Sequence, residues 1–260
     1  MTTDQYVVIG NPAVAPGINR LSVGPSGVPV AANPQAPTAV QPGQFHMLKT
    51  LAPEPLLPRP ISIHEVAGDV LSFLYEIKGA GTRNIAALAP GDPIRVTGPL
   101  GRGFDVDGLT GRILLVAGGI GIAPFRYLAR MLAEAGRTQV TLAAGFRGLP
   151  YGIQDFQPFI PDVRIATEDG SAGVKGRVTA LYDPRDFDVV VACGPVPMMR
   201  AVQQGCVQAG TRGVLSMEAR MACGIGLCLG CTIRTTTGMR RVCTDGPVFP
   251  GEEVFFDAHA

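Results

Sequence analysis

The chain has 260 residues, of which 46% are hydrophobic and only 17% are charged. This length fits two or three domains with substantial cores. The 22 basic and 21 acidic residues leave a net charge of +1. Such a balance argues against nucleic acid or an anionic membrane as the main partner, because both bind basic surfaces. The 34 glycines and 23 prolines lie in an otherwise apolar chain, which indicates a turn-rich globular protein.

The first residues contain neither a basic stretch nor an apolar segment, so we expect no secretory signal. The longest run without charged or hydrogen-bonding side chains, Ile113–Phe125, is shorter than the ~20 residues that a membrane-spanning helix needs. We therefore expect a soluble, cytoplasmic protein that binds no membrane. In that compartment, the six cysteines are better explained as metal ligands, reactive thiols or core residues than as disulfides.

Residues 1–108 contain short β-prone segments between Gly/Pro turns, a pattern typical of an antiparallel barrel or sandwich. Within this part, residues 24–43 are rich in proline and glycine and are interpreted as a long surface excursion. The expected strands are Tyr6–Ile9, Gly43–Lys49, Ile61–Glu65, Leu71–Ile77 and Pro93–Gly98.

Residues 109–213 show a different pattern, in which buried strands alternate with helices. This alternation predicts a doubly wound parallel sheet. Residues 214–260 form a third part, rich in cysteine and glycine and too short for a core of its own. The expected strands of the sheet are Ile113–Ala117, Val140–Ala144, Val163–Thr167 and Val189–Ala192, and the expected helices are Pro124–Ala135, a short one near Val178–Tyr182, and Val196–Ala209.

Four cysteines of the third part, Cys223, Cys228, Cys231 and Cys243, have the spacing C-x4-C-x2-C-x11-C. This is the spacing of plant-type [2Fe–2S] sites. The glycines between these cysteines allow the backbone to direct N–H groups at the cluster sulfurs. A structural zinc site is the alternative. Zinc sites of this kind are usually built from two C-x2-C motifs, however, and the chain has a single such motif.

The segment between the last two of these cysteines predicts a hairpin centred on Thr237. With that centre, Cys231 and Cys243 face each other, with Cα atoms roughly 4.5–5.5 Å apart. Of the other two cysteines, Cys206 fits the core side of a helix. Cys193 follows a strand, where it either lines a ligand site or is a plain buried thiol.

A glycine-rich turn, with Gly118, Gly119 and Gly121 followed by Pro124, connects a strand to a helix. Free N–H groups at such a turn bind phosphate, although any tight strand-to-helix turn also favours glycine. A second loop, Cys193-Gly194-Pro195, is expected at the same sheet edge and strengthens the prediction of a nucleotide site.

The strand that ends at Thr167 is followed by Glu168 and Asp169. If these carboxylates line the ribose, they repel a 2′-phosphate and favour NAD over NADP. The alternative is that they are ordinary solvated loop residues.

Several motifs occur in a characteristic order: Arg59-Pro60-x-Ser62, Gly79-x-Gly81-Thr82, Gly98-Pro99-Leu100-Gly101, the glycine-rich turn and Cys-Gly-Pro. This order resembles the ferredoxin–NADP reductase superfamily, in which a flavin-binding barrel precedes a nicotinamide-binding sheet. The tail, Met221-Ala222-Cys223 to Cys243-x-Asp245-Gly246-Pro247, resembles the electron-transfer subunits of NAD-dependent (class 1B) dihydroorotate dehydrogenases.

The resemblance implies a flavin-binding barrel over 1–108, an NAD-binding α/β domain over 109–213 and a [2Fe–2S] module over 214–260. It implies that the four module cysteines hold the cluster and that NAD(H) is a substrate. It implies no separate acid–base residue, and His46, His64 and His259 are isolated in the sequence. The residues implied to hold FAD are Arg59, Pro60, Ile61, Ser62, Leu74, Tyr75, Glu76, Gly81 and Thr82.

The implied reaction is an electron relay. A partner subunit with FMN oxidises dihydroorotate, and electrons cross the cluster singly to FAD, which reduces NAD⁺. The partner is expected to be a second chain, in a heterotetramer of two copies of each. Three alternatives stay open: the same relay serving a hydrogenase or sulfide-dependent reductase, a self-contained NADH oxidase or diaphorase, and a zinc-stapled binding module without activity.

Overall fold

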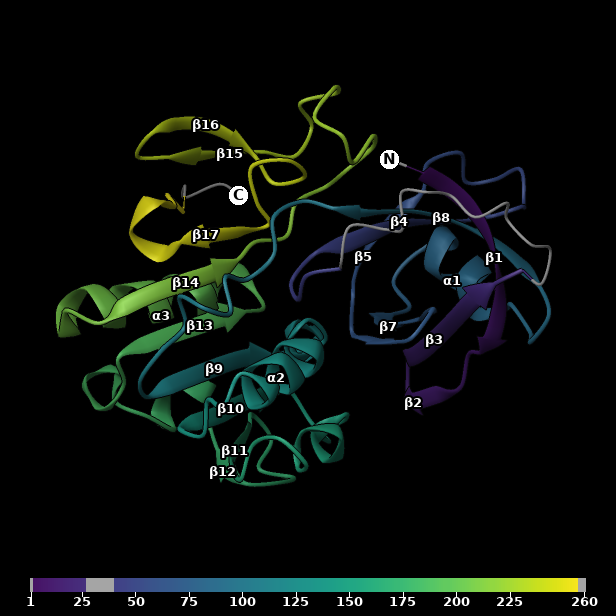
Figure 1. Cartoon of the computed structure of the whole chain (residues 1–260). Helices are drawn as coiled ribbons and strands as arrows, with labels where there is room; N and C mark the ends of the chain where they lie inside the picture. The colour runs from purple at the N-terminus through teal and green to yellow at the C-terminus, as the bar shows by residue number, and fades with distance from the viewer. Residues whose placement is uncertain (1, 27–39, 257–260) are drawn as a thin grey trace.

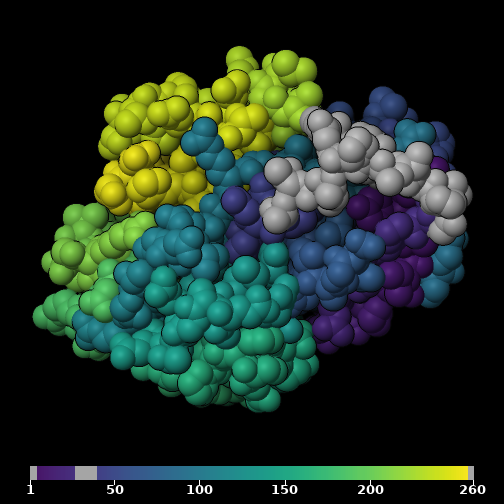
Figure 2. Space-filling model, viewed as in Figure 1, coloured from purple at the N-terminus to yellow at the C-terminus, as the bar shows by residue number. Residues whose placement is uncertain are grey.

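The computed structural model describes residues 2–26 and 40–256. Most of the expected excursion at 24–43, and His259, therefore lie outside the described residues. The chain forms a β-barrel, a doubly wound sheet and a small hairpin module (Figure 1). Figure 2 shows the three parts in direct contact.

The first part is an eight-stranded, entirely antiparallel sheet in the order β5-β4-β8-β1-β3-β7-β6, with β2 paired to β3. It curves until β5 lies beside β7, which gives the expected barrel. Alternate side chains fill its interior, among them Leu21, Phe73 and Ile94. The elements are β1 (Thr2–Gly10), β2 (Ala13–Ala15), β3 (Ile18–Pro25), β4 (Phe45–Thr50), β5 (Arg59–Ser62), β6 (Glu65–Ala67), β7 (Val70–Glu76), α1 (Ala80–Ala86) and β8 (Pro93–Leu100).

Three features of the barrel differ from the sequence prediction. The Arg-Pro-x-Ser motif forms β5 itself, whereas the expected strand was Ile61–Glu65. The Gly-x-Gly-Thr motif begins α1, where no helix was expected, and the Thr82 hydroxyl accepts hydrogen bonds there from the N–H groups of Lys78 and Gly79. Strand β3 was not predicted, since glycine and proline close to it suggested a turn-rich segment.

The second part is a seven-stranded sheet in the order β12-β11-β10-β9-β13-β14-β17. All its pairs are parallel except β14 with β17, so the predicted doubly wound sheet is confirmed. Helix α2 covers one face and α3 the other, as the separate clusters around Leu128 and Val202 show. The elements are β9 (Ile113–Gly118), η1 (Gly119–Ile122), α2 (Phe125–Glu134), β10 (Val140–Phe146), η2 (Ile153–Phe156), β11 (Asp162–Thr167), β12 (Val174–Lys175), η3 (Val178–Ala180), η4 (Pro184–Asp186), β13 (Val189–Cys193), α3 (Val196–Ala209) and β14 (Arg212–Ser216).

The third part of the chain adds a hairpin and one further strand of the sheet. Strands β15 (Thr232–Thr235) and β16 (Gly238–Arg241) form the hairpin, and β17 (Val248–Pro250) pairs with β14 before η5 (Gly251–Glu253). The expected division between residues 213 and 214 falls inside β14. The cysteine-rich part, which is too short for a core of its own, therefore packs on the edge of the parallel sheet.

The hairpin register differs from the prediction by one residue. Thr232 pairs with Arg241 and Thr235 with Gly238, so the turn is centred between residues 236 and 237. The N–H of Val242 donates to the carbonyl of Cys231, which places Val242 and not Cys243 opposite Cys231. The prediction of a hairpin centred on Thr237 was wrong because a two-residue turn has its centre between two residues.

No helix in the described part of the chain is long and apolar enough to cross a membrane.

Candidate flavin pocket and iron–sulfur module

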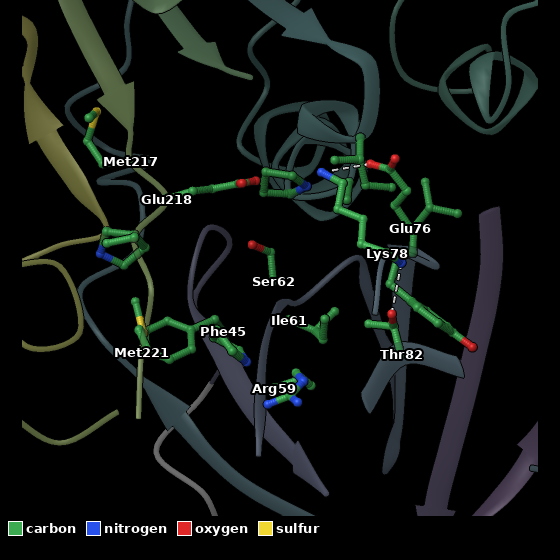
Figure 3. A pocket seen from close by; sticks show the side chains of 18 residues that line it. Phe45, Arg59, Ile61, Ser62, Glu76, Lys78, Thr82, Met217, Glu218 and Met221 are labelled. Carbon is green, nitrogen blue, oxygen red and sulfur yellow. Dashed lines mark hydrogen bonds and ion pairs between the residues drawn. The ribbon is translucent and has the colours of Figure 1, made fainter. Parts of the chain in front are cut away.

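A pocket of about 240 Å³ lies where the three parts meet (Figure 3). Its walls come from barrel strands β4, β5 and β7, from the turn after β9, and from the segment that follows β14. Of the nine residues predicted to hold FAD, eight line it; the ninth, Gly81, lies directly beneath Arg59. The lining residues are Phe45, Arg59, Pro60, Ile61, Ser62, Leu74, Tyr75, Glu76, Lys78, Thr82, Ile120, Ala123, Pro124, Met217, Glu218, Ala219, Met221 and Pro247.

The barrel wall holds Arg59 in one position. Its guanidinium donates to the carbonyls of Leu57 and Pro58, at 3.0 and 3.2 Å. A Cβ on Gly81 would come 2.2 Å from its Nε, so only glycine leaves room for this arginine. Arg59 is thus an oriented cation on the pocket wall, the kind of group that binds a phosphate.

Tyr75 turns its hydroxyl away from solvent. The hydroxyl donates to Oδ1 of Asn11 at 3.0 Å, and burial raises the pKa of Tyr75 to about 12. This phenol therefore stays neutral, and the residue contributes surface for a flat ring but no ionisable group.

The opposite wall was not predicted from the sequence. It combines Ile120, Ala123 and Pro124 of the glycine-rich turn with Met217, Glu218 and Met221 beyond β14. Pro124 and Met221 belong to motifs noted in the sequence, but no motif predicted that these two segments would form one wall, because they come together only through the tertiary fold.

Three charged side chains face one another at this pocket. Lys78 forms an ion pair with Glu76 at 2.9 Å. Glu218 and Lys78 extend from opposite sides of the pocket with their charged ends toward each other (Figure 3). The Glu218 side chain is open to solvent on its pocket side. The protein atoms around it still desolvate its carboxyl group, and this raises the pKa of Glu218. Lys78 partly counters this effect, and Glu76 adds to it.

The two loops predicted to bind NAD do meet at the carboxyl edge of the sheet. A Cβ on Gly121 would come 2.2 Å from the carbonyl oxygen of Cys193, and one on Gly118 would come 2.6 Å from Pro195 Cδ. These two glycines are therefore needed for loop packing itself. Gly119, with φ +53°, is less crowded, since a Cβ there would meet only the Tyr151 hydroxyl, at 3.8 Å. The Cys193 thiol is fully buried, which raises its pKa and keeps it protonated.

The cysteine module directs backbone N–H groups at its thiols. Gly226 donates to Sγ of Cys243 at 3.1 Å, and Cys228 donates to Sγ of Cys223 at 3.4 Å. Burial alone would raise the pKa of Cys223, but these and neighbouring N–H groups lower it to about 6. Such donors stabilise thiolates and the sulfur ligands of a cluster.

The four thiols form two interacting pairs. Cys223 interacts with Cys228, and Cys231 with Cys243, whose pKa rises to about 11 through burial and this neighbour. Within the described residues, no three Cys, His, Asp or Glu side chains converge tightly enough for a single metal ion. Four cysteine thiolates are the ligand set that a [2Fe–2S] cluster requires.

The module is also fixed to the pocket. Gly224, with φ +70°, packs on Met47 and Leu100 of the barrel, while Met221, two residues before Cys223, lines the pocket. The thiols and the pocket are therefore joined by one short segment of chain.

Comparison with known proteins decides the family. Residues 218–255 match the iron–sulfur cluster binding domain of dihydroorotate dehydrogenase B. An electron transfer subunit of dihydroorotate dehydrogenase B (NAD⁺) from Clostridium acetobutylicum is 43% identical over 218 residues, covering 84% of this chain and 87% of that protein. The same subunit of Clostridium perfringens is 42% identical over 215 residues, covering 82% and 87%. The chain belongs to this family of electron transfer subunits.

Solved structures agree with the family. The chain of an NADH-dependent reduced ferredoxin–NADP oxidoreductase superimposes with a TM-score of 0.80 at 26% identity, covering 97% of this chain and 90% of that one. The FAD/NAD binding domain of a nitric oxide dioxygenase from Vibrio cholerae gives a TM-score of 0.67 at 18% identity, covering 81% and 95%. The predicted fold class, the NAD-linked oxidoreductase class and the cofactor set of FAD, [2Fe–2S] and NAD are confirmed. The zinc-stapled alternative is not supported.

Proposed function

We propose that this subunit carries electrons singly from an FMN-containing dihydroorotate dehydrogenase catalytic subunit, through its [2Fe–2S] cluster and FAD, to NAD⁺. The observation that supports this most is the segment Met217–Met221, which lines the pocket and leads directly to Cys223. A hydride carries two electrons, whereas an iron–sulfur cluster passes one at a time. A flavin handles both, so it belongs between them.

In this proposal, Cys223, Cys228, Cys231 and Cys243 ligate the cluster. The two interacting thiol pairs and the N–H groups directed at their sulfurs support the assignment. FAD occupies the pocket at the junction of the three parts. Arg59 and Ser62 are its polar contacts on β5, Thr82 serves mainly to fix the start of α1, and Leu74 and Tyr75 provide apolar surface.

NAD(H) is proposed to bind at the sheet edge formed by Gly118–Gly121 and Cys193–Pro195. Gly119 offers the open backbone there, while Cys193 supports the loop from beneath. Glu168 and Asp169 are exposed beyond β11, where they disfavour a 2′-phosphate. This arrangement supports the preference for NAD over NADP.

The remaining assignments concern the assembly. The family name implies a catalytic partner, and we propose a heterotetramer with two copies of each chain in the cytoplasm. The division into 1–108, 109–213 and 214–260 is proposed as a functional one, with β14 shared between the last two parts.

The proposal is tested by affinity purification of the chain from native extract, followed by an assay of the complex. We expect an FMN-containing dehydrogenase to co-purify and the complex to reduce NAD⁺ when dihydroorotate is added. A complex that contains the flavoprotein partner but does not reduce NAD⁺ when dihydroorotate is added would contradict the proposal.

A second candidate is the same relay serving a different electron donor. The similarity over 97% of the chain to a ferredoxin–NADP oxidoreductase favours keeping this candidate. The same purification separates the two, because a hydrogenase or sulfide-dependent partner would appear in place of the dehydrogenase. A self-contained NADH oxidase would reduce dyes at full rate without any partner.

A further inference from the structure

Glu218 differs from the other residues around the flavin pocket. It is a carboxyl group on the wall contributed by the segment between β14 and the cysteines, and it points across the pocket (Figure 3). Its interactions with Lys78, Glu76 and the thiol of Cys193 are electrostatic and act through space. Neither the resemblance to the reductase superfamily nor the motifs assign it a role.

The relay itself requires a proton in this pocket. An iron–sulfur cluster delivers electrons without protons, whereas the hydride that leaves for NAD⁺ consists of two electrons and one proton. One proton must therefore enter the pocket for every two electrons that arrive from the cluster.

The other ionisable groups among the described pocket-lining residues are less suited to donate this proton. Arg59 carries a guanidinium, a group that does not give up its proton in proteins, and the amine of Lys78 forms an ion pair with Glu76. The Tyr75 hydroxyl is directed at Asn11 and away from the pocket. Glu76 is already engaged as the partner of Lys78 in this ion pair.

Glu218 has the chemistry that the step requires. Neighbouring protein atoms desolvate the carboxyl and raise its pKa, so the protonated form is favoured more than in a fully solvated glutamate. A flat ring bound in the pocket would shield the Glu218 carboxyl from solvent and so disfavour its charged form. The ammonium of Lys78 faces the carboxylate that remains after the proton has left.

We propose that Glu218 donates the proton that joins the two electrons from the cluster, an inference that rests on the relay proposed above. Its O–H bond breaks, the proton enters the pocket, and the two electrons come from the reduced cluster in single steps. The hydride then leaves for NAD⁺, and the Glu218 carboxylate recovers a proton from water at the mouth of the pocket. Lys78 is a positioning residue that stabilises this carboxylate.

The test compares two ways of reducing the flavin in the Glu218→Gln subunit. A one-electron reductant such as dithionite supplies no proton, whereas NADH supplies a hydride that already contains one. In stopped-flow experiments we expect reduction by dithionite to slow at least tenfold and to lose its solvent deuterium effect. Reduction by NADH should stay within about twofold of the unchanged protein. Glu252→Gln, an exposed carboxyl outside the pocket, serves as the matched control.

Infrared difference spectra give a readout that does not depend on turnover. On reduction of the unchanged subunit, the band of a protonated carboxyl should disappear, and this signal should be missing from Glu218→Gln but present in Glu252→Gln. Glu218→Asp, with a shorter acid, should give an intermediate rate. An unchanged dithionite rate, equal slowing by both reductants, or an infrared signal that persists in Glu218→Gln would each overturn the inference. Loss of flavin from the unchanged protein would instead count against the proposed function.

Discussion

His46 shows how burial of one polar residue controls stability. It lies inside the barrel with its ring edge-on to Phe73, and a Cβ on Gly98 would come 2.3 Å from the ring. Its Nδ1 has no hydrogen-bond partner among the described residues. Burial lowers the pKa of His46 to about 4, so the folded protein holds the ring neutral.

This burial predicts an acid-sensitive fold. The unfolded chain binds a proton at His46 below pH 6.5 and the folded chain only near pH 4, so stability is complete above pH 6.5 and falls as the pH drops through this window. The loss at pH 5 relative to pH 7.5 should be about 2 kcal/mol from this residue. Urea unfolding of the unchanged protein and of His46→Phe at both pH values measures it. An equal loss in the variant would assign the effect to other groups.

The residues of the candidate site differ in how far the sequence alone could predict them. The four cysteines and the Arg59–Ser62 motif could be named because their spacing is tied to chemistry. Lys78, Met217 and Glu218 could not be named, since each is an ordinary residue until the fold places it on a pocket wall. Gly118 and Gly121 were predicted to bind NAD, and the structure adds a second reason for glycine, because loop packing leaves no room for a side chain at either position.

The secondary-structure elements were predicted well where periodicity was strong. Buried strands such as β9 and β13 stand out as apolar runs, and α2 as a helix closed by Gly136. Helix α1 was missed because two glycines at its start resemble a loop, whereas its cap depends on Thr82. The hairpin was found but with the wrong register, since spacing alone does not settle where a two-residue turn is centred.

The junction between β8 and the cysteine module depends on a glycine. Gly101 has φ +76°, and a Cβ there would come 2.6 Å from the carbonyl oxygen of Gly246 and 2.7 Å from Pro247 Cδ. The N–H of Arg102 also donates to the carbonyl of Gly246. The two nearest atoms belong to a backbone carbonyl and a proline ring, neither of which can move aside as a flexible side chain could.

Gly101→Ala should therefore destabilise the protein more than an equivalent change in an open position. Gly136→Ala is the matched control, because Gly136 has φ +72° with nothing within 4 Å. Both variants lose about 1 kcal/mol to backbone strain, and Gly101→Ala loses about 1–3 kcal/mol more through overpacking. Thermal or urea unfolding measures the difference in stability. Equal losses of stability in the two variants would show that the junction accepts the added methyl group without overpacking.

At the scale of the whole molecule, a charged cluster holds the barrel against the sheet. Glu65 of the barrel accepts hydrogen bonds from Arg126 and Arg130 of α2, and all three side chains are at most one-quarter exposed. Nearby, Nδ1 of the buried His64 lies 2.8 Å from the Ala123 carbonyl oxygen. These contacts join the barrel to the segment after β9 that contributes Ala123 and Pro124 to the pocket.

Glu65→Gln should weaken this connection. The change leaves two arginines without their carboxylate, and we expect a loss of about 2 kcal/mol in the free energy of unfolding. Glu134→Gln removes an exposed partner of the same Arg130 and should cost under about 1 kcal/mol. Denaturant titrations of both variants measure which one loses more stability. Equal losses would mean that the charged side chains around Glu65 do not connect the barrel to the sheet.

The central claim is that one chain holds an iron–sulfur cluster and a flavin side by side. The most direct measurement is the iron, sulfide, zinc and FAD content of the anaerobically purified chain, together with its visible spectrum. We expect about two irons, two sulfides and one FAD per chain. Cys243→Ser should lose the cluster absorption, and Cys206→Ser, at a buried cysteine of α3, should keep it. A colourless chain with stoichiometric zinc and no FAD would contradict the account.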